Sequence, residues 1–272
     1  MWPHNRRPSW PGQGVKAARS RRIETHLTWG PMDVSKFEAP AKGGPPQPGP
    51  KPGEPAPAGG SEPIITAPWP VAVLSLGLVA LFWVQTGFPQ AQVQQAFGFS
   101  PLLLAQGHWE RLVTAIFVHG AWAHVLIDAG CVLAFGAPVA RHLGPGVRGV
   151  AAFAGFFLAC GVIGFLAFAA LRWGHPGIAI GASGAASGLM AAAARIIAGD
   201  GRVGPILSAP VWQIGGGWFG VNAIMAFSGN LLIPDGAYAV PGWQPHVAGF
   251  LAGLLLIGVG SRLAGGGRDA FA

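Results

Sequence analysis

A serine and a histidine in the C-terminal half of the chain are the residue types that acyl transfer requires. Ser183 stands in the run GASG, and His246 stands in the later run PHVAGFLAG. A serine hydroxyl is a weak nucleophile until a neighbouring base takes its proton, and a neutral imidazole can do this near pH 7. The two residues therefore predict a serine nucleophile with a histidine as its general base.

Glycines around both residues predict that their helices pack closely. Gly249 and Gly253 are four residues apart, so they share one face of a helix that begins near His246. Glycine faces let two helix backbones approach, which would bring Ser183 and His246 to a similar depth. A plainer interpretation stays open, in which the serine belongs to a small-residue packing face and the histidine is an ordinary core residue.

A third polar group lies in the run HGAWAHVLID, which holds His119, His124 and Asp128. His124 and Asp128 are four residues apart and share one helix face. His124 can donate a hydrogen bond to an oxyanion, whereas Asp128 can donate only when protonated. Two alternatives remain: a polar cap that ties the helix to the preceding connection, and a metal site. We predict no metal, because the chain lacks an HExxH motif and metal chemistry leaves the serine motif unexplained.

The elements that carry these residues are apolar blocks. Only 10% of residues are charged, against about 25% in soluble domains. A spanning helix needs about 20 mostly apolar residues. The sequence therefore predicts an all-α bundle of six membrane-spanning helices, over residues 69–88, 122–142, 147–171, 181–198, 211–231 and 245–263. The connection 89–121 is too apolar for a free loop and too broken to span, so it should lie partly embedded in the outer leaflet.

The placement of basic residues predicts the orientation of this bundle. Six arginines flank one set of helix ends, and two flank the other: Arg141, Arg148, Arg195, Arg202, Arg262 and Arg268 against Arg111 and Arg172. Basic residues concentrate on the cytoplasmic side of membrane proteins. Both termini are therefore expected in the cytoplasm. Richness in Gly, Ala and Arg is typical of a GC-rich bacterial genome, so a bacterial inner (cell) membrane is the expected location.

The ends of the chain differ in composition from the membrane domain, expected at 66–264. Residues 1–65 lack apolar periodicity and include a Pro/Gly-rich stretch, so they predict a disordered, basic cytoplasmic tail. A short cytoplasmic tail is expected at 265–272. Residues 1–31 carry +5 of the net charge of +7, which argues against nucleic-acid binding and favours contact with anionic lipids. Met32 is an alternative to Met1 as the start of translation.

Together these segments resemble the rhomboid family of intramembrane serine proteases, over roughly residues 69–263. The run WERL at 109–112 is similar to the family's Trp-Arg motif in the first external loop. The HGAWAHVLID run is similar to its H-x4-H-x3-N pattern. The GASG run and the glycine-spaced run after His246 are similar to its G-x-S-G and last-helix motifs.

The resemblance implies a Ser183–His246 dyad and no cofactor. It implies an oxyanion hole made by His124, the position of Asp128 and the Ser183 backbone amide. It also implies structural roles near the site for His119, Trp109, Arg111, Gly181, Gly184, Gly249 and Gly253. Substrates of the family are transmembrane segments, cleaved near their outer ends after entering beside the second and fifth helices.

Asp128 departs from the family pattern, which usually has Asn at this position. An amide donates a hydrogen bond at any pH, whereas an ionised carboxylate repels an oxyanion. The departure favours one alternative, a weak or inactive rhomboid-like protein that binds transmembrane clients. A small transporter is a further alternative, but such proteins often contain repeated halves, and no internal repeat is present. The sequence assigns neither the substrate nor the oligomeric state.

Overall fold

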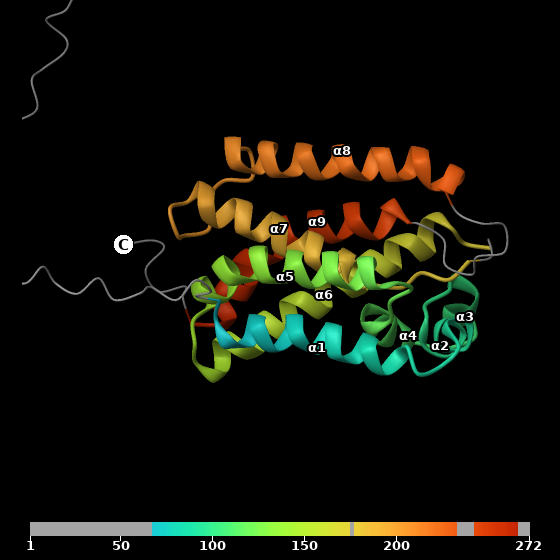
Figure 1. The fold of residues 1–272 in the computed structure, drawn as a ribbon. Coiled ribbons are helices and arrows are strands. Elements are labelled where there is room, and N and C mark those ends of the chain that lie inside the picture. The colour runs from blue at the N-terminus through green and yellow to red at the C-terminus, as the bar shows by residue number, and fades with distance from the viewer. Residues whose placement is uncertain (1–66, 175–176, 233–241, 266–272) are drawn as a thin grey trace, which may run out of the picture. The chain divides into compact units, whose positions relative to one another are not determined.

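The computed structural model describes residues 67–174, 177–232 and 242–265, with the side chains of 225–232 excepted. The predictions for the N-terminal tail, and for all but the first residue of the C-terminal tail, lie outside this part of the chain. The described part is helical, apart from isolated β-bridges, which confirms the predicted all-α class. Figure 1 shows long helices that run side by side.

Six long helices form close to the predicted blocks: α1 (Trp69–Gln85), α5 (Trp122–Leu143), α6 (Val147–Leu171), α7 (Ser183–Ala198), α8 (Ala209–Leu232) and α9 (Trp243–Leu263). α5, α8 and α9 are one to three residues longer than predicted, whereas α1 and α7 are shorter for identifiable reasons. α1 ends before the sequence TGFP, where glycine and proline disfavour further helix. α7 begins at Ser183 rather than at residue 181, because Gly181 has a φ of +109°, which a right-handed helix does not accommodate.

The connection between α1 and α5 folds into short helices: α2 (Gln90–Phe97), α3 (Pro101–Ala105), α4 (Arg111–Thr114) and the 3-10 helix η2 (Ala115–Phe117). Phe99 and Ala179 exchange two backbone hydrogen bonds, and the buried Phe99 ring stacks on Phe165 of α6. These contacts hold the connection against the bundle. Figure 1 shows α2, α3 and α4 together at one end of the long helices.

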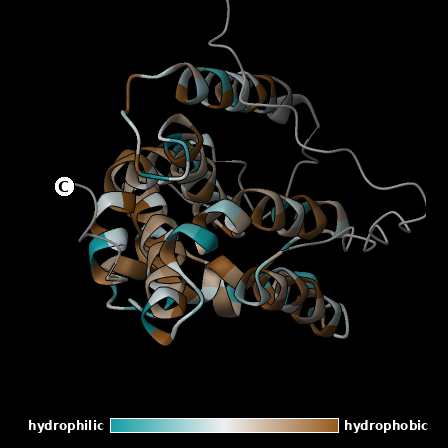
Figure 2. Ribbon diagram, turned by 90° about the vertical axis from the view of Figure 1, so that its left-hand side faces the viewer, coloured by the Kyte–Doolittle hydropathy of each residue, from teal (hydrophilic) through white to brown (hydrophobic). Residues whose placement is uncertain are grey.

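Three of the described helices, α5, α6 and α9, are long and apolar enough to cross a membrane, and α1 and α7 are apolar but shorter. The count of six spans therefore stays a prediction. Large apolar side chains on the outer faces, including Leu76 (70% exposed) and Leu255 (67% exposed), suit contact with lipid. Figure 2 shows that hydrophobic residues dominate the helices.

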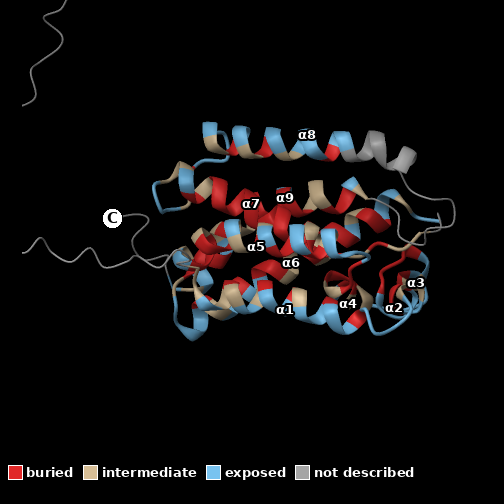
Figure 3. Ribbon diagram, viewed as in Figure 1, coloured by how far each residue is buried: buried red, intermediate tan, exposed pale blue. Residues whose placement is uncertain are grey.

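α7 forms the centre of the bundle and packs against α5, α6, α8 and α9. Most of its residues are buried, and they are mainly alanine and glycine, which let the neighbouring helices approach. α8 packs on α7 and α9, and its other face is exposed, as Figure 3 shows. Ser183 thus begins the central helix of the bundle.

Candidate active site

Ser183 and His246 meet near the beginnings of two adjacent helices. Ser183 is the first residue of α7, and His246 lies in the first turn of α9. His246 Nε2 is 2.7 Å from Ser183 Oγ, a hydrogen-bonding distance for a hydroxyl and a ring nitrogen. Both side chains are only partly buried. This geometry is the one required when an imidazole takes a proton from a serine.

The close approach of α7 and α9 depends on glycines in both helices. A Cβ at Gly249 would collide with the carbonyl of Gly184, and one at Gly253 would collide with the carbonyl of Gly188. Gly184 in turn leaves room for the carbonyl of Pro245, the residue before the histidine. The glycine contacts therefore set the separation of the two helices that carry Ser183 and His246.

Gly181 shapes the turn that precedes the serine. Its φ of +109° is readily adopted by glycine alone, and its amide donates to the Ala115 carbonyl at 2.9 Å. A side chain at this position would collide with the His124 ring and touch the Asp128 carboxylate. The turn then leads directly into α7, whose first amides have no partner within the helix and can accept an anionic oxygen.

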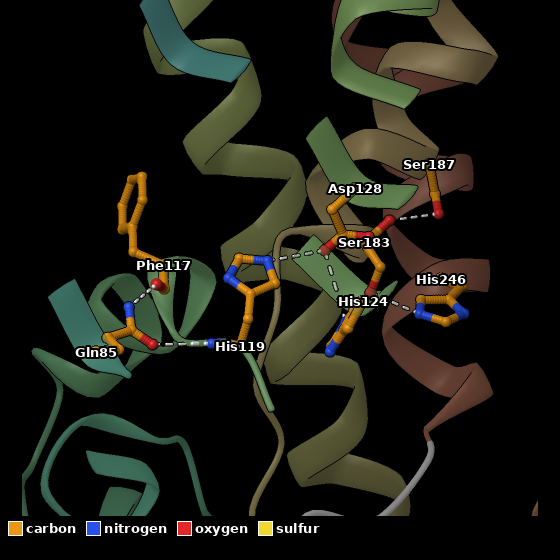
Figure 4. A network of polar contacts seen from close by, with 8 residues as sticks. All are labelled: Gln85, Phe117, His119, His124, Asp128, Ser183, Ser187 and His246. Atoms are coloured by element: carbon orange, nitrogen blue, oxygen red, sulfur yellow. Dashed lines mark hydrogen bonds and ion pairs between the residues drawn. The ribbon is translucent and has the colours of Figure 1, made fainter. Parts of the chain in front are cut away.

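His124 and Asp128 of α5 lie beside Ser183 at the start of α7, as Figure 4 shows. Asp128 is buried, and its Oδ2 lies 3.2 Å from His119 Nε2 and 3.6 Å from His124 Nε2. The carboxylate therefore faces two imidazole nitrogens. The His124 ring is about one third exposed, at 34%, so it remains accessible from outside the bundle.

His119 is fully buried and joins three elements. Its backbone amide donates to Gln85 Oε1 of α1 at 3.2 Å, and Gln85 Nε2 donates to the Phe117 carbonyl of η2 at 2.8 Å. Its ring nitrogen Nε2 faces Asp128 of α5. His119 thus lies between the embedded connection and α5, where its contacts are those of a structural residue.

Arg111 and Trp109, the two residues expected to fix the embedded connection, lie in different surroundings. Arg111 donates from one guanidinium nitrogen to the carbonyls of Gln95 and Gly98, at 2.6 and 3.2 Å, and so ties α4 to the end of α2. Trp109 is 63% exposed. Arg111 therefore contributes polar contacts within this connection, beside the bond from the Thr114 hydroxyl to the Phe97 carbonyl at 2.8 Å.

Three further residues surround Ser183 and His246, and none of them belongs to the motifs recognised in the sequence. Ser187, one turn after Ser183, donates to the Ser183 carbonyl at 2.7 Å. Trp218 of α8 donates from Nε1 to Ser187 Oγ at 3.0 Å. Asn222 Oδ1, also from α8, contacts His246 Nδ1. An amide four residues after a tryptophan, within a mostly apolar helix, is the sequence signal that points to this group.

His119, His124 and Asp128 could also hold a cation, because one ligand atom from each lies within 4.8 Å of the others. Two imidazoles and a carboxylate are suitable ligands for a transition metal. Contacts between the imidazole nitrogens and the carboxylate account for the same arrangement without an ion.

Comparison with known proteins identifies the class. A sequence model of the Rhomboid domain matches residues 106–263, which is more than half of the chain. The chain belongs to the rhomboid family, as the motifs predicted, although the match leaves out α1. With its apolar helices, the chain is therefore an integral membrane protein.

One curated relative is the protein named "Putative rhomboid protease YdcA" from Bacillus subtilis (strain 168). It is 31% identical to this chain over 125 residues, which cover 44% of this chain and 59% of the relative. The similarity thus spans less than two thirds of the relative's length.

Proposed function

We propose that this protein is an intramembrane serine endopeptidase that cleaves transmembrane segments of membrane-protein substrates. The observation that carries the proposal is the 2.7 Å contact between Ser183 Oγ and His246 Nε2. It occurs in a chain of the rhomboid family and joins the two residues that the motifs selected. No cofactor is needed, because the hydroxyl and the imidazole together supply the nucleophile and the base.

The reaction follows from the positions of the two side chains. Ser183 Oγ attacks the scissile carbonyl carbon while its proton passes to His246 Nε2. The tetrahedral intermediate then collapses, and His246 returns the proton to the leaving amine. The acyl-serine that remains is hydrolysed by a water molecule, which His246 deprotonates in the same way. The partial exposure of both side chains leaves room for water to reach the acyl group.

The oxyanion of the intermediate would lie at the start of α7. The Ser183 amide is one donor, and His124 Nε2 is a second. Gly181 gives the backbone room to pass close to the His124 ring. Asp128 assists when it is protonated and opposes the oxyanion when it is ionised. Losing one donor of an oxyanion hole costs about 10²–10³ in rate, so the state of Asp128 affects how fast this site works.

The second candidate function is a rhomboid-like protein that binds transmembrane clients without cleaving them. Asp128 is the observation that favours it, because an ionised carboxylate beside His124 weakens the oxyanion hole. The contact between serine and histidine favours the protease, because client binding alone does not require an activated hydroxyl.

Covalent labelling by a fluorophosphonate probe in detergent separates the two functions. The unchanged protein should be labelled and should cleave a transmembrane reporter. Ser183→Ala should lose both properties, and His246→Ala should lose nearly all of both, because the hydroxyl then keeps its proton. Ser75→Ala is the matched control, since Ser75 is a buried serine on α1. Reporter cleavage that persists in Ser183→Ala would overturn the mechanism, whereas absent labelling and cleavage in the unchanged protein would favour client binding.

In the cell, the proposed location is the bacterial inner membrane, with both termini in the cytoplasm. The basic residues at the ends of α5, α7 and α9 support this orientation. The dyad lies at the beginnings of α7 and α9, so cleavage would occur toward the outer side of the membrane, where α2, α3 and α4 also gather.

A further inference from the structure

Asn222 of α8 contacts the ring nitrogen of His246 that faces away from the serine. His246 Nε2 faces Ser183 Oγ, while Nδ1 faces Asn222 Oδ1. The Asn222 side chain is buried, at 4% exposure, in an apolar helix. A buried amide in such a place is costly unless its polar atoms have partners. Both polar atoms of the Asn222 side chain have a hydrogen-bonding partner.

The partner of the Asn222 nitrogen fixes the direction of the amide. Asn222 Nδ2 donates to the Trp218 backbone carbonyl at 2.9 Å. A flipped amide would place its oxygen against that carbonyl oxygen, so Oδ1 must face His246. An amide oxygen only accepts hydrogen bonds, so the nitrogen opposite it must carry the proton. Nδ1 is then the protonated nitrogen, and Nε2 keeps the lone pair that a base requires.

A second contact from α8 supports the same group of residues. The Trp218 ring lies 5.6 Å from the His246 ring, and its indole nitrogen donates to Ser187, which donates to the Ser183 carbonyl. α8 thus contacts the histidine directly through Asn222 and Trp218, and it reaches the serine's backbone only through Ser187 of α7. Its outward face is exposed, as Trp212 shows at 68%.

We infer that Asn222 is a positioning residue that holds His246 in the tautomer able to accept the Ser183 proton. The inference rests on the proposed function, and it adds a contribution from α8 to a dyad supplied by α7 and α9. Because the amide is held through the α8 backbone, the tautomer of the base depends on α8 being docked against the bundle.

The first test compares Asn222→Ala with the unchanged protein, using the transmembrane reporter. Without its acceptor, His246 can also adopt the tautomer protonated at Nε2, which cannot take the serine proton. We expect kcat to fall on the order of tenfold, the effect of losing one neutral hydrogen bond, with KM nearly unchanged. Val221→Ala, at a half-exposed neighbouring position, should keep the full rate. An unchanged kcat in Asn222→Ala would overturn the inference.

Asn222→Asp separates positioning from packing. A carboxylate at this position still accepts the Nδ1 proton, so kcat should recover at neutral and alkaline pH. It also stabilises the imidazolium, so the acidic limb of the kcat profile should move to higher pH. Among the described residues, the other ionisable groups that act electrostatically on His246 are His124 and Asp128 of α5, and they stay the same in all the variants. If Asn222 were needed only for packing, the kcat of Asn222→Asp would not exceed that of Asn222→Ala at any pH.

Trp218→Phe tests the second contact, because phenylalanine keeps a ring beside His246 and removes the donor to Ser187. We expect a fall in kcat of several-fold, with Trp212→Phe on the exposed face of α8 as the matched control. Equal rates for the two variants would show that this donor does not support the dyad.

Nitrogen NMR of ¹⁵N-histidine-labelled protein in detergent reads the tautomer without any need for activity. The His246 signal, identified by its loss in His246→Ala, should show a protonated Nδ1 in the unchanged protein and a mixture in Asn222→Ala. A protonated Nε2 in the unchanged protein would overturn the inference. Absent cleavage together with a protonated Nδ1 would instead count against the proposed function alone.

Discussion

Asp128 is the residue at which the chain departs from the family motif, and its charge affects the proposed reaction. Its Oδ2 lies 3.6 Å from His124 Nε2, so an ionised carboxylate competes with an oxyanion for the proton on that nitrogen. Its other neighbour, His119 Nε2 at 3.2 Å, needs only an acceptor. An asparagine oxygen could serve that second contact equally well, and the amide would carry no negative charge beside His124.

Asp128→Asn is therefore expected to raise the rate, because the neutral amide removes the negative charge beside His124. The gain should reach about 10²-fold if the amide restores one full oxyanion donor. The measurement is the initial rate of reporter cleavage against pH for both proteins, in one detergent. A rate that is the same across the whole range would show that Asp128 does not face the oxyanion. A large loss would show that its charge is needed to hold His119 or His124.

At the scale of elements, the dyad depends on how closely α9 packs against α7. Gly249→Ala places a methyl group against the Gly184 carbonyl, so the helices must separate. Overpacking of this kind costs about 1–3 kcal/mol, and here it should also move His246 away from Ser183. We expect a lower melting temperature in detergent and a loss of fluorophosphonate labelling.

Gly258→Ala is the matched control for that prediction. It lies on the same helix, and a Cβ there meets no atom within 4 Å. Alanine also suits a helix interior better than glycine does, by about 0.5–1 kcal/mol. Its stability and labelling should therefore equal or exceed those of the unchanged protein. Equal effects of the two substitutions would contradict the role assigned to the Gly249 contact.

At the scale of the whole molecule, polar contacts join three helices at the end opposite the dyad. His142 of α5 contacts the Gly201 carbonyl and Ser261 of α9, at 2.9 and 3.1 Å. Arg195 of α7 donates to the carbonyls of Gly204 and Leu254. The helix ends with more arginines thus meet on one side of the bundle, which we propose faces the cytoplasm.

This orientation predicts the behaviour of a reporter enzyme that is active only after export. Fused after Ala272, it should stay inactive, because the C-terminus is expected in the cytoplasm. Fused to a chain that ends at Gln106, beyond α1, it should be active. The measurement is reporter activity per amount of fusion protein in whole cells. High activity after Ala272 would mean that the number of spans or the orientation is wrong.

The sequence by itself determined the helix blocks and the motif residues. Apolar blocks broken by Gly, Pro and charge predicted all six long helices within a few residues, because burial in lipid requires continuous apolar segments. The GASG run and the glycines after His246 selected Ser183 and His246 as partners. These signals are local, since residue type and short spacing are enough to carry them.

Only the tertiary structure decided how α8 and the embedded connection contribute. Asn222 is one of three amide side chains in a mostly apolar helix, and its contact with His246 depends on how α8 docks on α7 and α9. The division of the connection into α2, α3, α4 and η2 likewise follows from contacts across the chain, such as Phe99 with Phe165. Asp128 faces two histidines because His119, from outside α5, packs against it. Contacts between residues distant in sequence leave no periodic signal, so they become visible only once the chain is folded.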